Sequence, residues 1–468
     1  MMRVNIYAMI VEKIVYSKKF LRPFLVKKLD KMLHKVIVED QKKNLKPVMQ
    51  KKYEFFMTML NCVLKNIDKG YISREVTRKL IKAMVKNALG KDPKKIKEVE
   101  KKYGKIIPAF IVLSPTSKCN LKCEGCYAAV ADVKFKTLPY ETVEKITDEC
   151  YNKYYQRFMT ISGGEPFLYK DSGKTLFDLW EKYNEMFFLV YTNGHFITKE
   201  VAKKLAELGN VVVAISVEGL EKETDERRGK GAFKKVLTAF KNLREAGVPF
   251  AISVTSTTKN IDILLDDKFY DFYFNKQGVS FMWQFQLMPV GHARSAMNLT
   301  LNPQQRLKLY RKWEQFMKEK KYCIADFWNS GILSDGCLAY GGEGGYLYIN
   351  WDGNIMPCVF VPYYVDNIID LYSKGKSLTD ALKSEFFRRG RKWKESYKKK
   401  KGNWLMPCSI RDHYGNWREN IATPDIKGEN KDAEEALRSE EYRKTLEKFD
   451  KELEELTVPI WEKEYLEK

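Results

Sequence analysis

The middle of the chain, from about residue 109 onward, alternates short apolar runs with amphipathic helical stretches. That alternation is typical of βαβ units and a parallel sheet. We expect strands near residues 109–114, 157–162, 186–192, 210–216, 249–256 and 279–288. After the last of these the chain offers one helix, at about 303–320, and then an irregular region, whereas a closed eight-stranded barrel needs two further units. The pattern therefore predicts an α/β fold built on an open, partial (β/α)6 barrel.

The residues before this barrel form a basic helical unit with a second helical region at about 51–89. Apolar side chains recur at helical spacing along Leu21, Leu25, Leu29, Met32, Leu33 and Val36, whereas Lys27, Lys28, Lys31 and Lys35 lie off that stripe. The stripe has two interpretations. Either the helix packs on the next domain and leaves its lysines in solvent, or it lies on an anionic membrane surface.

Behind the barrel, residues 323–425 are rich in Gly, Tyr, Trp and Cys. Asp352-Gly353 between two apolar runs predicts a hairpin with strands at 346–349 and 354–359. Beyond Asp432 the tail is a charged helix with a thin apolar stripe, which we expect to dock on the body or on a partner. The expected units are a helical unit (1–106), the barrel (107–320), a small cysteine-containing domain (321–425) and the charged C-terminal helix (426–468).

Composition narrows the classes of protein that this chain can be. With 44% hydrophobic residues and only 15 Pro in 468 positions, it is neither disordered nor fibrous. Nine cysteines in 468 residues are too few for a secreted disulfide scaffold, and an odd count cannot pair completely in disulfides. A reducing cytoplasm therefore fits this chain better. No apolar run approaches the ~20 residues of a membrane-spanning helix, and we expect no signal peptide. The net charge is +22, and residues 1–100 hold 25 Lys and Arg against 10 Asp and Glu.

Three cysteines lie within eight residues directly after the first predicted strand, at Cys119, Cys123 and Cys126. Three thiolates on one short loop can chelate a soft metal. A structural zinc site would normally add a fourth Cys or His nearby. The histidines are all remote in sequence, at His34, His195, His292 and His413. An iron-sulfur cubane held by three cysteines leaves one iron open to another ligand, so a chelating role is favoured over buried structural thiols.

The spacing of these cysteines resembles the signature of the radical S-adenosylmethionine (SAM) superfamily, and the resemblance continues over about residues 108–295. It implies that the chain binds a [4Fe-4S] cluster and SAM, whose amino and carboxylate groups chelate the open iron. The family's glycine-rich turn is matched by Gly163, Gly164, Glu165 and Pro166, which follow the second strand. In such a turn Gly permits close backbone approach and the carboxylate meets the SAM ammonium. A simple turn is the alternative interpretation.

The resemblance implies further contacts at the carboxyl ends of the strands, the face on which barrels of this type carry their active sites. Asn193 follows the third strand. Ser216 and Glu218 follow the fourth. Their polar side chains would hold the ribose hydroxyls of SAM.

Two more groups complete the implied SAM site. Arg228, or Arg227 in its place, would meet the SAM carboxylate. Thr255 after the fifth strand, and Met288 to Gly291 after the sixth, fall where family members contact adenine. The resemblance assigns no catalytic residue beyond these binding positions.

A second constellation consists of Cys337, Cys358 and Cys408. It resembles the SPASM or shorter "twitch" extension, which binds auxiliary iron-sulfur clusters behind many radical SAM barrels. Only three of the seven cysteines of the full pattern match. The resemblance therefore implies at most one auxiliary cluster, with Cys323 as candidate fourth ligand or with one iron open. Buried free thiols are the alternative, as we expect for Cys62 and Cys150, which lie in helical patterns.

The resemblance implies that the reduced cluster cleaves SAM and that the 5'-deoxyadenosyl radical takes hydrogen from a substrate. We expect a peptide or protein substrate, with a membrane lipid or isoprenoid as the alternative suggested by the basic N-terminal unit. An electron donor such as ferredoxin or flavodoxin is the expected partner. A nucleic-acid module, suggested by the basic stretch 388–401, is disfavoured because it leaves Gly-Gly-Glu-Pro unexplained. The expected location is the cytoplasm, with peripheral contact to the inner membrane surface as a further option.

Overall fold

The computed structural model describes residues 2–17, 20–41, 44–90, 92–128, 135–289 and 296–467. Within these ranges the main sheet has nine strands in the order β7-β6-β5-β4-β3-β2-β1-β8-β9. The strands are β1 (Phe110–Leu113), β2 (Phe158–Ile161), β3 (Phe187–Thr192), β4 (Val211–Val217), β5 (Ala251–Ser256), β6 (Phe281–Gln286), β7 (Ile324–Asp326), β8 (Tyr346–Ile349) and β9 (Ile355–Met356). β1 to β7 run parallel to their neighbours. The six predicted strands and the parallel, open barrel are confirmed.

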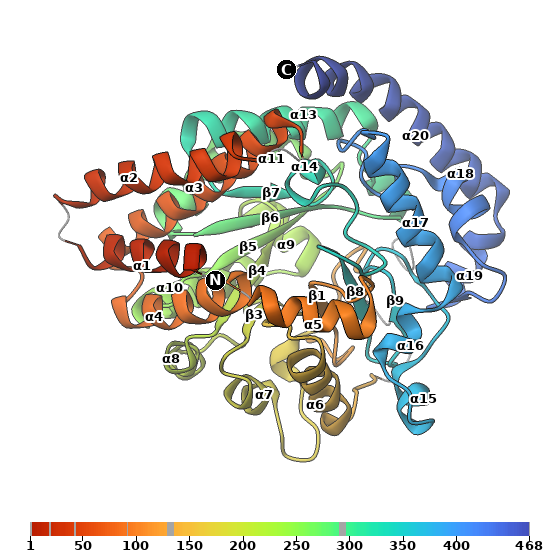
Figure 1. Ribbon diagram of the computed structural model, residues 1–468, viewed down its shortest axis with the longest axis horizontal. Helices are drawn as coiled ribbons and strands as arrows, with labels where there is room; N and C mark the ends of the chain where they lie inside the picture. The colour runs from red at the N-terminus through yellow and green to blue at the C-terminus, as the bar shows by residue number, and fades with distance from the viewer. Residues whose placement is uncertain are drawn as a thin grey trace.

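Helices surround this sheet, with the N-terminal helices and the C-terminal helices on opposite sides of it (Figure 1). Those before the sheet are α1 (Met2–Tyr16), α2 (Arg22–His34), α3 (Lys46–Asp68), α4 (Arg74–Leu80), its π-helical continuation η2 (Ile81–Leu89) and α5 (Pro93–Tyr103). The barrel helices are α6 (Tyr140–Asp148), α7 (Leu176–Lys182), α8 (Lys199–Leu208), α9 (Glu221–Arg228), α10 (Ala232–Glu245), α11 (Ile261–Leu265), α12 (Asp267–Tyr270) and α13 (Pro303–Gln315). After them come α14 (Gly331–Ser334), α15 (Ile368–Ser373), α16 (Leu378–Leu382), α17 (Glu385–Lys399), α18 (Tyr414–Asn416), α19 (Lys431–Arg438) and α20 (Glu440–Trp461).

The sheet extends further on both edges than the sequence pattern predicts. β7 lies in the region expected to be irregular and pairs with β6. Its three residues are too few to give a periodic signal. The predicted hairpin forms as β8 and β9, and β8 also pairs in parallel with β1. The small cysteine-containing region is therefore continuous with the barrel sheet. A second sheet pairs β10 (Tyr363–Tyr364) with β11 (Lys427–Gly428).

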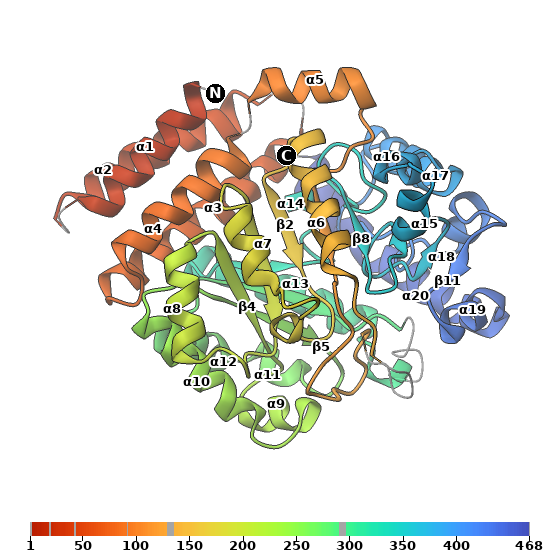
Figure 2. The same cartoon turned by 90° about the horizontal axis from the view of Figure 1, so that it is seen from below.

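The N-terminal helices close one end of the barrel. Ala83 and Met84 of η2 pack in one apolar cluster with Leu189 of β3 and Trp283 of β6, whose side chains face the barrel interior. Figure 2 shows these helices grouped along one side of the strands. The helical unit therefore forms a floor beneath the residues that line the barrel.

The apolar stripe of α2 packs against its neighbouring helices. Leu29 is buried, and Leu25 and Leu33 are partly buried in a cluster with residues of α1, α3 and η2. For Leu25, Leu29 and Leu33 the packed-helix interpretation is correct, because the helices fold back on one another and bury these side chains. Leu21, at the start of the stripe, stays exposed, and contact of the lysine face with a membrane surface stays a prediction. No helix among the described residues is both long and apolar enough to cross a membrane.

The charged tail helix docks on the body of the protein. α20 continues to Leu466, and the Tyr465 hydroxyl lies 2.7 Å from that of Tyr310 on α13. Tyr442 donates a hydrogen bond to the carbonyl oxygen of Pro289 at 2.8 Å. α20 thereby ties the segment after β6 to the C-terminal helices.

Candidate active site

The barrel encloses a cavity of about 380 Å3 at the carboxyl ends of its strands. Ten of the thirteen barrel positions proposed to bind the cluster and SAM line this cavity: Cys119, Cys123, Cys126, Gly163, Gly164, Asn193, Ser216, Arg228, Thr255 and Met288. Glu165, Pro166 and Glu218 are buried just behind the wall. Gly291 lies outside the described residues. The chain thus brings together side chains from β1 to β6, because parallel strands place their carboxyl ends at one edge.

The three-cysteine loop forms one wall of the cavity. Burial raises the pKa of Cys119 to about 11, and burial likewise raises the pKa of Cys126. Neutral thiols are therefore favoured until a cation compensates the thiolates, and bound metal deprotonates coordinating thiols outright. No three His, Cys, Asp or Glu side chains of the described ranges converge tightly enough for a single metal ion. Three thiols beside an open cavity fit a larger group, such as a cubane with one open iron.

Asn193 and Asn120 hold the cysteine loop against the end of β3. The Asn193 amide donates to Asn120 Oδ1 at 2.8 Å and approaches Cys119 Sγ at 3.9 Å. His195, remote in sequence from the cysteines, lies beside this loop, with its Nδ1 3.1 Å from Asn120 Nδ2. The polar end of β3 therefore positions the loop, a role that sequence reasoning did not assign to it.

The glycine-rich turn packs directly on the backbone of the cysteine loop. A Cβ on Gly164 would lie 2.4 Å from the carbonyl oxygen of Lys118, and one on Gly163, whose φ is +120°, would lie 2.6 Å from that of Thr116. The Glu165 N–H donates to the Lys118 carbonyl at 2.8 Å. Glycine is required here because any side chain would push the two loops apart.

The Glu165 carboxylate is fully buried and engaged by protein donors. It accepts hydrogen bonds from the Thr192 hydroxyl at 2.7 Å and from the N–H groups of Asn193 and Phe167 at 2.8 and 3.2 Å. Burial raises its pKa to about 7 against these stabilising bonds. Glu165 therefore braces the end of β3 in this structure, and its predicted contact with an ammonium group stays a prediction.

Glu218 pairs with both candidate arginines. Its Oε1 accepts from Arg227 at 2.6 Å and from two nitrogens of Arg228 at 2.5 and 2.8 Å. The third nitrogen of Arg228 lies 4.0 Å from Cys123 Sγ. Glu218 thus orients the arginines toward the cysteine loop rather than presenting its own carboxylate to the cavity. A ribose contact for Glu218 stays a prediction.

The remaining cavity wall was only partly found from the sequence. Ser253 lines the cavity beside Ser216, with their hydroxyls 3.1 Å apart. Period-two alternation from Thr255 on the same strand was the signal that could have found it. A group of mostly aromatic side chains forms another part of the wall: Phe158, Leu189, Trp283, Phe285, Phe327 and Phe360. Sequence reasoning missed this wall, because its members come from five separate segments.

The second cysteine constellation lies behind the barrel. The segments that carry these cysteines contact one another, since the Tyr340 N–H donates to the carbonyl oxygen of Pro357 at 3.1 Å and the Tyr340 hydroxyl lies 2.9 Å from that of Ser409. Tyr346 of β8 places its hydroxyl 2.8 Å from Cys358 Sγ. These soft donors fit an iron-sulfur group better than a hard cation.

The other cysteines do not join this group. Cys323 is buried directly before β7, where Cys62 and Thr58 are the neighbours that affect the pKa of its thiol. Cys62 and Cys150 lie in the main apolar core, as predicted. A fourth-ligand role for Cys323 therefore gains no support from its position.

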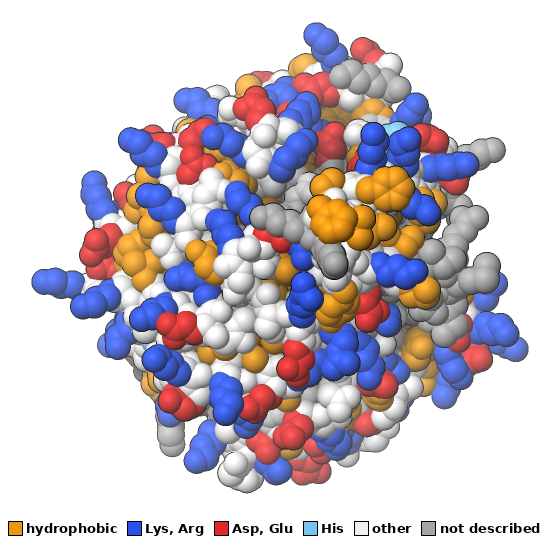
Figure 3. Space-filling model, turned by 90° about the vertical axis from the view of Figure 1, so that its left-hand side faces the viewer, with side chains coloured by type: hydrophobic (Ala, Val, Ile, Leu, Met, Phe, Trp, Pro, Cys, Tyr) orange, Lys and Arg blue, Asp and Glu red, His pale blue; other side chains and the backbone are white. Residues whose placement is uncertain are grey.

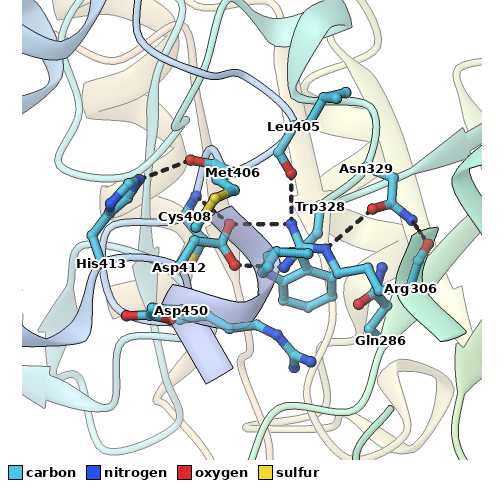
Figure 4. A network of polar contacts seen from close by, with 12 residues as sticks. Gln286, Arg306, Trp328, Asn329, Leu405, Met406, Cys408, Asp412, His413 and Asp450 are labelled. Atoms are coloured by element: carbon cyan, nitrogen blue, oxygen red, sulfur yellow. Dashed lines mark hydrogen bonds and ion pairs between the residues drawn. The ribbon is translucent and has the colours of Figure 1, made fainter. Parts of the chain in front are cut away.

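A buried polar network connects the cavity with the second constellation (Figure 4). Gln286 of the cavity wall donates to Asp326 at 3.3 Å, and Asn329 donates to Asp326 at 2.9 Å. Arg306 then links Asn329 to Asp412. Asp412 in turn accepts from the Cys408 N–H at 2.9 Å. The two candidate centres are therefore held in one rigid, solvent-excluded framework.

Two family models match this chain. Residues 113–267 match the Radical SAM superfamily, and residues 337–412 match the SPASM iron-sulfur cluster-binding domain. The first range contains the three-cysteine loop and the glycine-rich turn, and the second contains Cys337, Cys358 and Cys408.

Curated relatives align over part of their length. Fe-coproporphyrin III synthase of Methanosarcina barkeri is 33% identical over 37% of this chain and 43% of its own. The sporulation killing factor maturation protein SkfB of Bacillus subtilis is 30% identical over 34% and 38%. Mycofactocin maturase MftC of Mycolicibacterium smegmatis is 33% identical over 37% and 43%. The chain thus spans about two-fifths of the length of these relatives.

A solved structure shares the fold. SuiB of Streptococcus suis, bound to the precursor peptide SuiA, superposes with a TM-score of 0.50 over 62% of this chain and 68% of its own, at 19% identity. At that identity the likeness concerns the arrangement of strands and helices alone.

Proposed function

Because the chain belongs to the radical SAM superfamily and carries a SPASM-type iron-sulfur domain, we propose that it cleaves SAM reductively and uses the resulting radical to take hydrogen from a peptide or protein substrate. The observation that carries this proposal is the convergence of the three-cysteine loop, the glycine-rich turn and the strand-end polar residues on one cavity. The proposal keeps the division into units 1–106, 107–320, 321–425 and 426–468, since each family match falls inside one of them.

In this proposal Cys119, Cys123 and Cys126 hold a [4Fe-4S] cluster. When bound, the cluster and SAM supply one electron and the 5'-deoxyadenosyl radical, respectively. Arg228, oriented by Glu218, offers a positive charge beside the cysteines for a carboxylate. Such charge-assisted contacts are among the stronger hydrogen bonds in proteins.

The neighbouring strand ends would hold the rest of SAM. The hydroxyls of Ser216 and Ser253 line the same cavity and suit ribose hydroxyl groups. Thr255 and Met288, which also line it, would contact adenine. The aromatic wall around Trp283 and Phe285 keeps water from the reacting centre.

We infer that Cys337, Cys358 and Cys408 hold one auxiliary cluster. The C-terminal region that carries them covers the barrel beside β1, through the pairing of β8. An electron donor such as ferredoxin or flavodoxin would supply both centres. A cytoplasmic setting is supported by nine cysteines that are all free thiols.

A peptide substrate is supported by two of the relatives, SkfB and MftC, which are named a maturation protein and a maturase, and by the peptide bound to SuiB. The third relative is named for the synthesis of Fe-coproporphyrin III. The second candidate substrate is a membrane lipid or isoprenoid. Its supporting observation is the apolar part of the cavity wall, where Phe158, Leu189 and Trp283 would meet an uncharged hydrocarbon group.

The test is anaerobic reconstitution with iron and sulfide, followed by assay of 5'-deoxyadenosine with SAM and dithionite. The triple Cys→Ala variant of the three-cysteine loop should form none. Cys358→Ala, which removes a thiol from the other centre, is the matched control and should still cleave SAM. A triple variant that matches the parent rate would refute the proposal.

The substrate class is tested by deuterium transfer. The enzyme is offered a deuterated peptide pool or a deuterated lipid extract, and 5'-deoxyadenosine is analysed by mass spectrometry. Deuterium should appear only with the peptide pool. Transfer from the lipid extract alone would select the second candidate.

A further inference from the structure

The tip of the α1–α2 hairpin exposes large apolar side chains. Phe20 is 73% exposed, Leu21 47% and Phe24 70%. Five of the ten exposed large hydrophobic residues of the described ranges fall between positions 9 and 24, with Met9 and Tyr16 as the others. Isolated exposed apolar residues are common, but a cluster of this kind marks an interaction site.

Four lysines lie next to this apolar tip, on the same face of α2. Lys27, Lys28, Lys31 and Lys35 follow Phe24 at steps of three and four residues and are all exposed. Among the described residues, none of these lysines has an acidic group within ion-pairing distance. Asp30, the acidic residue between them, accepts a hydrogen bond from Tyr53 instead.

The position of this face favours a flat partner. The start of α2 lies at the left-hand extremity of the molecule in Figure 1. In Figure 3, which views the molecule from that side, an apolar patch stands out among Lys and Arg side chains. The inward stripe of α2 is already buried against α1, α3 and η2, so the exposed aromatic tip is what remains for a partner.

We propose that this face docks the enzyme on an anionic lipid bilayer, with Phe20, Leu21 and Phe24 inserted at the interface and the four lysines over the lipid phosphates. An anionic bilayer can bind the aromatic tip and the lysines at the same time. Aromatic rings partition into the membrane interface, and Lys side chains reach its charged surface. A polyanion such as nucleic acid would use the lysines but leave the aromatic tip in water. The proposal is independent of the radical chemistry.

Two free-energy contributions, from the lysine charges and from the buried aromatic rings, set the expected loss of binding. Each lysine near an anionic surface contributes about fivefold to binding. Two neutralised lysines should therefore weaken binding by roughly 25-fold. Burying a Phe side chain contributes roughly tenfold or more, so losing both aromatic rings should weaken binding by about a hundredfold.

The experiment is flotation of the full chain with phosphatidylcholine vesicles, with and without phosphatidylglycerol. The parent should float with the anionic vesicles only and lose binding as salt rises, because salt screens the lysine charges. Phe20→Ser with Phe24→Ser, and separately Lys28→Gln with Lys31→Gln, should lose binding. All four positions are exposed, so these variants should keep the parent's circular dichroism spectrum.

The matched control is Ile369→Ser, which removes an exposed apolar side chain from α15, among the C-terminal helices; Ile369 is 43% exposed. It should float like the parent. Equal flotation with neutral vesicles, or double variants that bind like the parent, would overturn the proposal. Absence of flotation at low salt, with a self-association that the Phe20/Phe24 variant abolishes, would instead assign the face to a second copy of the chain.

Discussion

Replacing Asp412 should destabilise the fold strongly, because it strands a buried positive charge. The side chains of Arg306 and Asp412 are 1% and 0% exposed. Arg306 contacts both carboxylate oxygens, at 2.5 and 3.2 Å, and also bonds Asn329 and the carbonyl oxygen of Leu405. Burial opposes the Arg306 charge, but the Asp412 carboxylate raises the pKa of Arg306. Breaking a pair of this kind typically costs about 3–5 kcal/mol.

A double replacement separates the cost of the unpaired Arg306 charge from the cost of the unpaired hydrogen-bonding groups. Asp412→Leu alone leaves the Arg306 charge and the Cys408 N–H without their partner, so we expect a loss of about 4 kcal/mol. Adding Arg306→Met removes the unpaired charge but leaves three buried polar groups without a partner, at about 1–3 kcal/mol each. These are the Cys408 N–H, the Asn329 amide oxygen and the Leu405 carbonyl oxygen. The double variant should therefore be no more stable than the single Asp412→Leu variant.

The assay is urea unfolding under anaerobic conditions, followed by circular dichroism. Glu385→Gln on α17 is the control, because this partly exposed carboxylate pairs with Arg388 and Arg389 at the surface and should cost less than about 1 kcal/mol. An Asp412→Leu variant within 1 kcal/mol of the parent, by the same scale, would refute the reasoning. So would a double variant that is clearly more stable than the single one.

Three further outcomes are expected. Burial raises the pKa of Glu165 to about 7, so the folded chain keeps a proton that the unfolded chain releases. Glu165 alone should lower the free energy of unfolding by up to ~3 kcal/mol between about pH 4.5 and 7, and Glu165→Gln should remove that share of the slope in urea titrations. The shares of Glu429 and Asp450 should remain, because burial raises their pKa values to about 7 and about 8. Gly164→Ala should push the cysteine loop away and lower 5'-deoxyadenosine formation, whereas Gly173→Ala, at a glycine with open space around it, should not. Reconstituted parent should carry about eight irons per chain and Cys358→Ala about four; an iron content unchanged by the substitution would reduce the second constellation to structural thiols.

The order of the strands and the position of the candidate site could be read from the sequence. Each barrel strand is a local apolar run, and each motif directly follows one. Parallel pairing then places Cys119, Gly163, Asn193, Ser216 and Thr255 at one edge without further information. For this reason the cavity that these residues line coincides with the one the sequence predicts.

The tertiary structure decided which hydrogen-bond partners the buried carboxylates have. In this structure Thr192 and Asn193 engage the oxygens of Glu165, and two arginines engage those of Glu218. The predicted contacts of both carboxylates with SAM stay predictions. A buried carboxylate accepts hydrogen bonds from the donors that neighbouring strands place beside it. The spacing of residues within one strand does not predict which donors those are. Cys323 likewise lies next to Cys62 of α3 rather than the C-terminal cysteines.

The sequence by itself determined the α/β barrel, the two cysteine constellations and the basic N-terminal helices, because each depends on local patterns of residues along the chain. Only the tertiary structure decided that β8 extends the sheet beside β1, that η2 forms the barrel floor, and that α2 buries its leucines while exposing Phe20 and Phe24. These outcomes depend on contacts between segments far apart in sequence. Their energies are set by how whole surfaces fit together, which local periodicity does not encode.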